Sequence, residues 1–303
     1  MTEFSAFIIF DSVNKVKFQS ILPGMILIAD SGSTKTTWSL INPVNGSIET
    51  FQTSGINPMY QDEETIYHLL QQEFTLNVPV TIKLFFYGAG CINNQVNDIV
   101  RHALTNFFHC TASFVETDLM AAARSLCQNS EGIACILGTG SNSCYYSGKE
   151  ITRHVAPLGY ILGDEGSGAD IGRKFIADLL KSQLPDHIID RFFKSFDFTP
   201  HQLLEHVYKK PFPNRFLAQF TRFIHENMDE SILRNLVKGS FKEFFDRNVS
   251  QYPESQRLPV HFTGSIAFYF EPLLRESANE SGFRVGIITK SPMEGLINYH
   301  IQS

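Results

Sequence analysis

The feature that most constrains the fold of this chain is a strand-turn-strand pattern that occurs twice. In residues 26–40 an apolar run gives way to small and hydroxylated residues with one lysine, and a strand-like stretch then resumes. In residues 133–147 an apolar run is again followed by a small polar turn, residues 138–141, and by a second strand-like stretch. Each copy then reaches a hairpin signal, Asn45-Gly46 or Gly148-Lys149, that leads into a third strand. The chain therefore contains a duplicated three-strand unit, whose period is too long for a solenoid.

Both turns offer backbone N–H groups and hydroxyls to a ligand that is rich in acceptor oxygens. The first turn begins at Asp30, whose carboxylate stands where a divalent cation could bind. A nucleotide phosphate with Mg²⁺ fits this chemistry. A single polar turn would usually be an ordinary surface loop, but two such turns facing each other could hold a polyphosphate from both sides.

Four motifs follow one another along the chain, at residues 30–36, 138–142, 163–167 and 262–267. In this order they resemble the motifs of the sugar-kinase, Hsp70 and actin superfamily. Within that superfamily they are similar to the N-acetylglucosamine kinase and BadF/BadG/BcrA/BcrD-type ATPase family, in which the first two motifs are phosphate loops and the last is the adenosine motif. The resemblance spans residue 25 to the end. It implies an α/β fold of two ribonuclease H-like (actin-like ATPase) domains with a cleft between them.

The alternation of strand and helix patterns along the chain agrees with such a fold. Apolar periodicity predicts helices at 62–74, 92–108, 119–126 and 266–276, strands at 82–87, 111–115, 260–262 and 284–289, and a mostly helical segment at 168–248. By resemblance, the first domain covers residues 25–122 and is completed by a C-terminal helix at 292–303, and the second domain covers residues 123–291. Residues 1–24 lack the features of a signal peptide and are predicted to be an N-terminal extension.

Composition favours an enzyme with small-molecule ligands. A net charge of −6 over 303 residues argues against nucleic acid or an anionic membrane as the main partner. The apolar cluster in residues 1–24 is too short to span a membrane. The five cysteines form no CxxC pair and are odd in number, which predicts reduced, buried thiols in a cytoplasmic protein. The oligomeric state stays open, with a homodimer as one option.

Asp118 is the predicted catalytic residue. It lies between a predicted strand and a predicted helix, and ligands of α/β proteins bind at the carboxyl ends of strands. Spacing alone is equally consistent with a helix N-cap at Thr117 or Asp118. By resemblance to the sugar kinases, Asp118 is the general base that accepts the proton of the attacking hydroxyl.

The resemblance also implies the other ligand contacts, with ATP and Mg²⁺ as cofactors. Asp30 is assigned to Mg²⁺. The predicted phosphate and adenosine contacts are Ser33, Thr34, Lys35, Thr139, Gly140, Ser141, Gly264 and Ser265. The predicted sugar contacts are Asn57, Asp118, Thr139, Gly159, Tyr160 and Asp164.

Several of these residues also have an ordinary structural interpretation. Lys35 could be a solvated turn lysine, Asp164 a helix N-cap and Glu165 a surface charge. Gly264 could be a structural glycine before a serine cap at Ser265. One position departs from the vertebrate-type kinases, because Leu158 stands where they carry a tryptophan, so the resemblance does not define the acyl-group contact.

The leading prediction is an ATP-dependent sugar kinase that phosphorylates the 6-hydroxyl of N-acetylglucosamine or a related amino sugar. The alternative is a BadF-type activator ATPase that drives a partner reductase or dehydratase through an iron–sulfur cluster, which needs cluster-ligating cysteines. The scattered cysteines argue against that alternative. A third interpretation is a sugar-sensing regulator without catalysis, against which the retained Asp30 and Asp118 argue.

Overall fold

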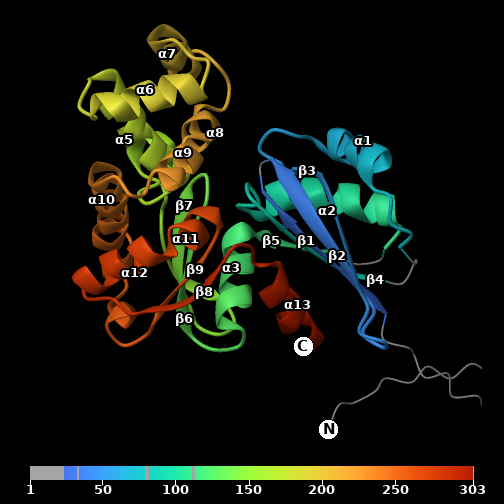
Figure 1. The fold of residues 1–303 in the computed structure, drawn as a ribbon. Coiled ribbons are helices and arrows are strands. Elements are labelled where there is room, and N and C mark those ends of the chain that lie inside the picture. Colours follow the sequence, from blue (N-terminus) through green and yellow to red (C-terminus); the bar gives the residue numbers. More distant parts are fainter. Residues whose placement is uncertain (1–23, 33, 79–81, 111–112, 303) are drawn as a thin grey trace, which may run out of the picture. The chain divides into compact units, whose positions relative to one another are not determined.

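The computed structural model describes residues 24–32, 34–78, 82–110 and 113–302 (Figure 1). Ser33 and residues 1–23 of the predicted N-terminal extension lie outside these ranges. The chain divides into two compact units, residues 1–118 and residues 119–303. This division falls four residues before the predicted domain boundary at residue 122, and the predicted domain organisation itself stays a prediction.

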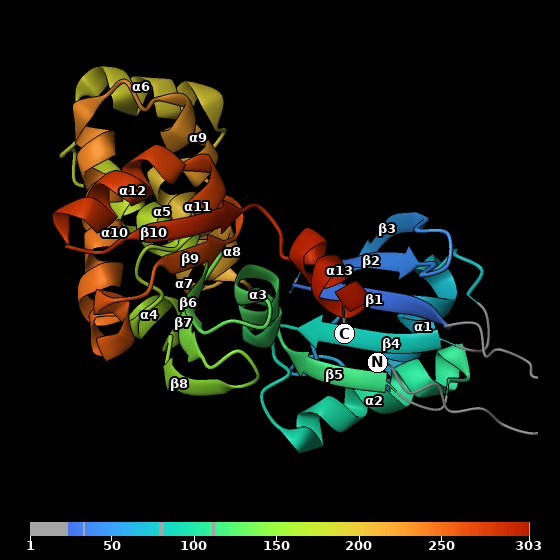
Figure 2. The same cartoon turned by 90° about the horizontal axis from the view of Figure 1, so that it is seen from below.

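The first unit is built on a five-stranded sheet with the strand order β3-β2-β1-β4-β5, which Figure 2 shows side by side. Its elements are β1 (Met25–Ser31), β2 (Lys35–Ile41), β3 (Ile48–Ser54), α1 (Glu63–Glu73), β4 (Ile82–Gly88), α2 (Asn94–Phe108) and β5 (Ser113–Thr117). The first three strands are antiparallel hairpins, and β1, β4 and β5 are parallel. Asp62 and Asn93 cap α1 and α2 by accepting backbone N–H groups, so both helices begin near their predicted positions.

The core of the first unit lies between α1, α2 and one face of the sheet. Alternate residues of β1, Leu27 and Ala29, pack with Ile66 of α1 and Val100 of α2. Trp38, the single tryptophan of the chain, is fully buried here, and its indole N–H donates to Thr53 Oγ1 at 2.9 Å. Each buried aromatic polar group needs such a partner, and this bond fixes β2 against β3.

The second unit repeats the strand order of the first. Its sheet runs β10-β9-β6-β7-β8, in which β6, β7 and β8 are antiparallel hairpins and β9 and β10 are parallel to β6. The strands are β6 (Gly132–Leu137), β7 (Ser141–Tyr146), β8 (Ile151–Val155), β9 (Val260–Thr263) and β10 (Val285–Thr289). The predicted duplication of a three-strand unit is therefore confirmed, and it extends to all five strands.

Helices surround the second sheet and fill the segment between β8 and β9. They are α3 (Asp118–Cys127), α4 (Gly159–Leu162), α5 (Gly168–Leu180), α6 (Asp186–Ser195), α7 (Pro200–Tyr208), α8 (Pro213–Ala218), α9 (Thr221–Glu226), α10 (Ser231–Arg247), two 3-10 turns (Val249–Gln251 and Pro253–Gln256), α11 (Ser265–Tyr269), α12 (Glu271–Glu280) and α13 (Met293–Gln302). One face of the sheet packs on α5, α10 and α12, and the other packs on α3 (Figure 1). Phenylalanines dominate the larger of these two cores.

The helix predicted at residues 266–276 is in fact two helices. α11 ends at Tyr269, and α12 begins at Glu271 with Pro272 in its first turn. A proline has no backbone N–H and its ring clashes with the carbonyl four residues earlier, so it tends to begin a helix and not to continue one. The single-helix prediction overlooked Pro272.

The C-terminal helix α13 packs against α3. Gln128 Nε2 donates to the Gly295 carbonyl at 3.0 Å, and a Cβ atom at Gly295 would lie 2.2 Å from Ser125 Oγ. Both helices fall within residues 118–302, and the contacts group α13 with the second unit. The predicted completion of the first domain by this helix stays a prediction.

All five cysteines are free and buried, which confirms the predicted reduced thiols. Three lie in the second unit on α3, β6 and β7, and two lie in the first unit near the ends of β4 and α2. Within the part of the chain that the structure describes, no helix has both the length and the apolar character needed to cross a bilayer.

Candidate active site

The carboxyl ends of three parallel strands meet at one edge of the first sheet. The register of β1 and β4 places Asp30 opposite Tyr87, and the register of β4 and β5 places Gly88 opposite Thr117. Asp118 directly follows Thr117 as the first residue of α3. Asp30 and Asp118 are 88 residues apart in the sequence, and the parallel pairing brings them to the same edge.

The two carboxylates influence each other. The pKa of Asp30 is raised from 3.8 to about 7, first because the carboxyl group is buried and second because Asp118 is negatively charged. The ammonium group of Lys35 acts in the opposite direction. This edge of the sheet therefore has an excess of negative charge that a bound cation would relieve.

A divalent cation fits this pair of acids. Mg²⁺ in phosphate-handling proteins binds through one or two carboxylates, keeps several waters and takes its remaining ligands from the substrate phosphates. Among the described residues there is no group of three or more His, Cys, Asp or Glu side chains arranged as a metal site. Asp30, beside Asp118, is thus suited to a water-rich Mg²⁺ site and not to a closed site made of protein ligands alone.

The thiol of Cys91 lies close to these acids and is not a competing nucleophile. Its pKa is raised to about 12 by burial and, secondarily, by the charges of Asp118 and Glu116. The thiol therefore remains protonated at neutral pH. Cys91 therefore adds no negative charge and no thiolate nucleophile to this edge of the sheet.

The first turn is a tight hairpin between β1 and β2. The Gly32 N–H donates to the Lys35 carbonyl at 3.0 Å, and the Thr34 carbonyl accepts from the Gly55 N–H at 3.0 Å. Thr34 and Lys35 are exposed, so their side chains are accessible to a ligand. This geometry does not test whether the two residues contact phosphate, so the phosphate-binding role of Thr34 and Lys35 stays a prediction.

Asn57 is buried beside the loop that follows β4. Its side-chain oxygen accepts the Met59 N–H at 3.0 Å, and its own backbone N–H donates to Gln61 Oε1 at 2.7 Å. A Cβ atom at Gly90 would lie 2.3 Å from the Asn57 oxygen, so only glycine permits this approach. With its oxygen occupied, Asn57 has its amide N–H groups left to donate to a ligand.

The second turn, residues 138–141, is held by the beginning of α5. The carbonyls of Gly138 and Thr139 accept the N–H groups of Gly168 at 2.8 Å and Ala169 at 3.0 Å. The Ser141 N–H donates to Asp164 Oδ1 at 3.2 Å. Among the described residues, the backbone N–H groups of Thr139 and Gly140 donate to no acceptor. The turn thus presents two adjacent N–H donors of the kind that bind anions.

The Asp164 side chain contacts this turn at Gly140 and Ser141. A Cβ atom on Gly140 would lie 3.1 Å from Asp164 Oδ2. The pKa of Asp164 is raised to about 6, mainly by burial, and the Ser141 N–H partly counteracts this increase. Asp164 is not a helix cap, because Ser167 caps α5 by accepting the Asp170 N–H.

Glu165 is buried, and the surface-charge interpretation of this residue is wrong. Its carboxylate pairs with Arg247 at 2.8 Å and accepts from Asn248 Nδ2 at 3.3 Å. These partners come from the end of α10, more than 80 residues further along the chain, which no local pattern could reveal.

Gly159 and Tyr160 form the first half of the short helix α4. Gly159 has a φ of 74°, and the preceding Leu158 also has a positive φ, 60°. Tyr160 packs against the core of the second unit, whereas Leu158 is 60% exposed. The tyrosine ring therefore has a packing role, and its predicted sugar contact stays untested.

Gly264 packs directly on the strand that precedes the second turn. It follows β9 with a φ of 119°, and a Cβ atom there would lie 2.3 Å from the Leu137 carbonyl oxygen. The glycine is thus structurally required, and the serine-cap interpretation is wrong because α11 has no side-chain cap bond at its start.

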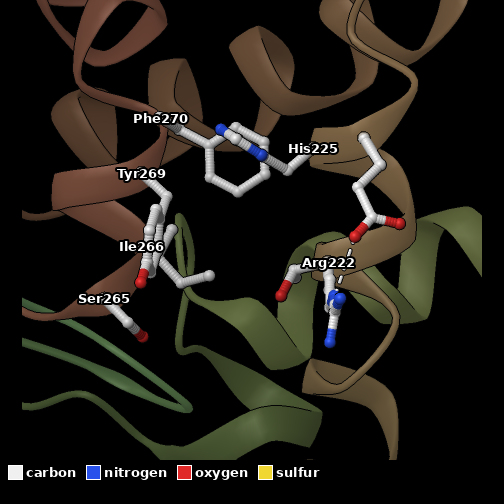
Figure 3. A pocket seen from close by; sticks show the side chains of 8 residues that line it. Arg222, His225, Ser265, Ile266, Tyr269 and Phe270 are labelled. Carbon is white, nitrogen blue, oxygen red and sulfur yellow. Dashed lines mark hydrogen bonds and ion pairs between the residues drawn. The ribbon is translucent and has the colours of Figure 1, made fainter.

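Ser265 lines a pocket of about 400 Å³ in the second unit (Figure 3). The other lining residues come from α9, α11 and the residue between α11 and α12: Thr221, Arg222, His225, Glu226, Ile266, Tyr269 and Phe270. His225 packs edge-on against Tyr269 and Phe270, with ring centroids 5.8 and 5.2 Å apart, and Arg222 pairs with Glu226 at 2.8 Å. The α9 residues carry no signal in the sequence, because nothing in their local pattern distinguishes them from an ordinary amphipathic helix.

Comparison with known proteins places this geometry in a family. A solved structure of a candidate N-acetylglucosamine kinase from Porphyromonas gingivalis is 45% identical to this chain, with a TM-score of 0.86. The match covers 92% of this chain and 99% of that protein. The chain belongs to the N-acetylglucosamine kinase family. The resemblance inferred from the four ordered motifs is thereby confirmed.

Two further proteins are similar to this chain at lower identity. The N-acetylmuramic acid/N-acetylglucosamine kinase of Clostridium acetobutylicum is 28% identical over 169 residues. That match spans 52% of this chain and about half, 54%, of the curated relative. A candidate N-acetylglucosamine kinase from Chromobacterium violaceum is 16% identical with a TM-score of 0.61, over 91% of this chain and 99% of that one, and supports the fold alone. No profile of a known protein family matches the chain.

The predicted fold class is confirmed by these neighbours and by the two five-stranded sheets with flanking helices. The names of the family's members agree with the predicted class of enzyme, a carbohydrate kinase.

Proposed function

We propose that this protein transfers the γ-phosphoryl group of ATP to the 6-hydroxyl of N-acetylglucosamine or a closely related amino sugar. The observation that carries the proposal is the pair of acids, Asp30 and Asp118, at the carboxyl edge of the first sheet. One acid serves the metal and the other serves the hydroxyl. The names of the relatives support the class of sugar.

In this proposal Asp118 is the general base. The oxygen of the 6-hydroxyl attacks the γ-phosphorus, the bond from that phosphorus to the β,γ-bridging oxygen breaks, and ADP leaves. The hydroxyl proton passes to the Asp118 carboxylate. Because phosphoryl transfer needs little covalent help, positioning of the hydroxyl contributes more than proton transfer. General-base assistance is worth about 10²- to 10⁴-fold.

Mg²⁺, when bound, would neutralise charge on the phosphate oxygens, and Asp30 is the residue proposed to hold it through water. The burial and the raised pKa of Asp30 support this role, because a nearby cation would favour its ionised form. Thr34 and Lys35 are the proposed phosphate contacts of the first unit. Ser33 shares that assignment on sequence grounds alone.

In the second unit, the N–H groups of Thr139 and Gly140 are the proposed phosphate donors. Their lack of an intramolecular acceptor among the described residues supports this assignment. The pocket beside Ser265 is proposed for the adenosine, because its size and its His225, Tyr269 and Phe270 rings suit a flat base.

Sugar recognition is assigned to polar groups of both units. The amide N–H groups of Asn57 can donate to a hydroxyl or to the acetyl oxygen. Asp164 and Gly159 belong to the second unit and stay in the proposal on the family resemblance. Tyr160 is the weakest member, since its ring packs in the core.

The alternative of an activator ATPase finds no support in the cysteines. An iron–sulfur cluster shared by two subunits needs thiolates at a surface, and all five cysteines of this chain are buried.

A coupled assay of ADP release with ATP and Mg²⁺ tests the proposed function. The substrates to compare are N-acetylglucosamine, N-acetylmuramic acid, N-acetylmannosamine, glucosamine and glucose. We expect the highest kcat/KM with an N-acetylated sugar and no reaction when the 6-hydroxyl is replaced by hydrogen. ADP release that no sugar stimulates would contradict the proposal.

A further inference from the structure

Two buried hydroxyls, those of Ser31 and Thr36, lie at the base of the first turn and have no role in the chemistry above. Ser31 is the last residue of β1 and Thr36 is its partner on β2. Their oxygens are 2.7 Å apart, and both residues are almost completely inaccessible to solvent, at 1% and 0% exposure. Buried hydroxyls of this kind are retained only where they satisfy other polar groups.

The pair bonds to the segment that precedes Asn57. Ser31 Oγ lies 2.9 Å from the Ile56 carbonyl and accepts the Ile56 N–H at 3.0 Å. Thr36 Oγ1 also accepts from that N–H at 3.3 Å, and it lies 3.2 Å from the Ser54 carbonyl. One arrangement satisfies all groups: Ser31 donates to the Ile56 carbonyl, and Thr36 donates to Ser31 or to the Ser54 carbonyl.

These bonds join two segments with different proposed ligands. Ser31 follows Asp30 and precedes Gly32, so it lies between the proposed metal acid and the phosphate turn. Ile56 directly precedes Asn57, whose amide is a proposed sugar contact. The Ser31 carbonyl also accepts the Ala89 N–H at 2.9 Å, in the loop that contacts Asn57 through Gly90.

We propose that Ser31 and Thr36 are positioning residues that couple the sugar subsite of the first unit to its nucleotide turn. This inference rests on the proposed function. Sugar bound at Asn57 orders residues 54–57, and the hydroxyl pair transmits that order to Gly32 and Thr34, the described residues of the turn. A turn that is already ordered loses less conformational entropy when it binds phosphate, so bound sugar raises the affinity of the protein for the nucleotide. By thermodynamic linkage, bound nucleotide raises the affinity for the sugar by the same factor.

The test is a comparison of nucleotide affinity with and without sugar. MgADP is titrated calorimetrically into the full-length protein alone and in saturating N-acetylglucosamine, and the ratio of the two dissociation constants is the coupling factor. We expect about a 5- to 150-fold ratio in the wild type. In Thr36→Val, which keeps the side-chain volume and removes the hydroxyl, the ratio falls towards 1. Thr36→Ser retains the hydroxyl and restores the ratio.

A second hydroxyl pair on the same strands provides a matched control. Ser39 Oγ and Thr50 Oγ1 are 3.0 Å apart, join β2 to β3 and contact neither turn nor Asn57. Ser39→Ala therefore removes a bond of the same kind, which is partly buried because Thr50 is exposed, and is expected to keep the wild-type ratio. Ser31→Ala deletes the other half of the coupling pair and gives an independent measurement.

The outcomes separate this inference from the proposed function. If sugar is phosphorylated and Thr36→Val and Ser31→Ala keep the wild-type ratio, the coupling role is overturned while the kinase remains. An equal loss of coupling in Ser39→Ala would also overturn it, because the effect would then reflect general loosening of the sheet. If the wild type binds and phosphorylates no sugar, the proposed function fails first and this inference fails with it.

Discussion

The two units hold the same kind of turn by different chemistry. In the first unit the turn after β1 is tied to its neighbours by the side chains of Ser31 and Thr36. In the second unit the turn after β6 is held by backbone N–H groups of Gly168 and Ala169 at the start of α5. A duplicated hairpin therefore does not require duplicated supporting contacts. Substitution of Ser31 or Thr36 can remove the side-chain support of the first turn and leaves the backbone bond from Gly55 to Thr34. In the second turn, substitution can remove the Asp164 contact and leaves the two backbone bonds from α5.

The units differ most at the residue that follows the fifth strand. β5 and β10 occupy equivalent places in the two strand orders. Asp118 follows β5, and Lys290 follows β10, where it donates to the Tyr269 hydroxyl at 2.6 Å. The same topological position thus carries an aspartate in one unit and a lysine in the other.

The largest effect is expected from substitution of Asp118, the residue that follows β5 in the first unit. Asp118→Asn removes the proposed base and should lower kcat about 10²- to 10⁴-fold, because proton transfer loses its acceptor. Lys290→Met, at the equivalent place in the second unit, should leave kcat within a few-fold of the wild type. Steady-state kinetics check both, with MgADP binding measured to confirm intact folding. Near-normal kcat in Asp118→Asn would remove this residue as the base.

The next effect concerns the residue after the fourth strand of each unit. In the first unit this residue is Ala89, and in the second it is Gly264, where an added Cβ would lie 2.3 Å from the Leu137 carbonyl oxygen at a φ of 119°. Gly264→Ala should destabilise the protein by roughly 2–5 kcal/mol through strain and overlap. Denaturant-induced unfolding of the wild type and of Gly264→Ala measures this difference in the free energy of unfolding.

A matched glycine substitution should act in the opposite direction. Gly239 lies inside α10, and no atom lies within 4 Å of a Cβ placed there. Gly239→Ala should therefore stabilise by about 0.5–1 kcal/mol. Equal destabilisation by both changes would indicate that the close approach at Gly264 is not what excludes a side chain.

A smaller effect distinguishes the two turns by how the free energy of unfolding depends on pH. Asp164, which supports the second turn, has a pKa of about 6 in the folded protein against an ordinary 3.8, so the folded state binds its proton more tightly than the unfolded chain. The stability that this group contributes is therefore greatest at acidic pH and declines as the pH rises from about 4 to about 6. Asp164→Asn keeps the oxygen that accepts the Ser141 N–H and should flatten this decline.

The pH comparison uses chemical unfolding at pH 4 to 7. Asp164→Asn should gain about 1–3 kcal/mol relative to wild type at pH 7 and less at pH 4. Thr36→Val should keep the wild-type pH slope, because hydroxyls do not titrate in this range. A parallel displacement of the Asp164→Asn curve at all pH values would show that the Asp164 charge is not the cause.

The smallest expected effect concerns the pocket that Ser265 lines. Arg222 pairs with Glu226, but its side chain is 86% exposed, so Arg222→Gln should change stability by less than about 0.5 kcal/mol. If the pocket holds the adenosine, KM for ATP should rise roughly two- to fivefold, within the energy of an exposed ion pair. KM for the sugar should not change. A change in the sugar KM alone would argue against adenosine in this pocket.

Much of the fold could be predicted because its signals are local. The apolar strands, the Asn45-Gly46 turn and the caps at Asp62 and Asn93 each depend on residues a few positions apart. Local patterns failed where one residue changes the backbone, as Pro272 does between α11 and α12. The surface-charge interpretation of Glu165 failed because its partners, Arg247 and Asn248, come from a distant segment. The helix-cap interpretation of Ser265 failed because Gly264 stands at the cap position of α11 and no side chain caps that helix.

The sequence alone determined the duplicated unit, the ordered motifs and the two acids at strand ends, because hydrophobic periodicity and turn chemistry depend on residues that are close together in the sequence. Only the tertiary structure decided that burial and the Asp118 charge raise the pKa of Asp30, that the N–H groups of Thr139 and Gly140 stay available, and that α9 supplies one wall of the Ser265 pocket. These properties depend on burial and on parallel pairing between segments that are far apart in the chain, and neither is encoded in any local stretch.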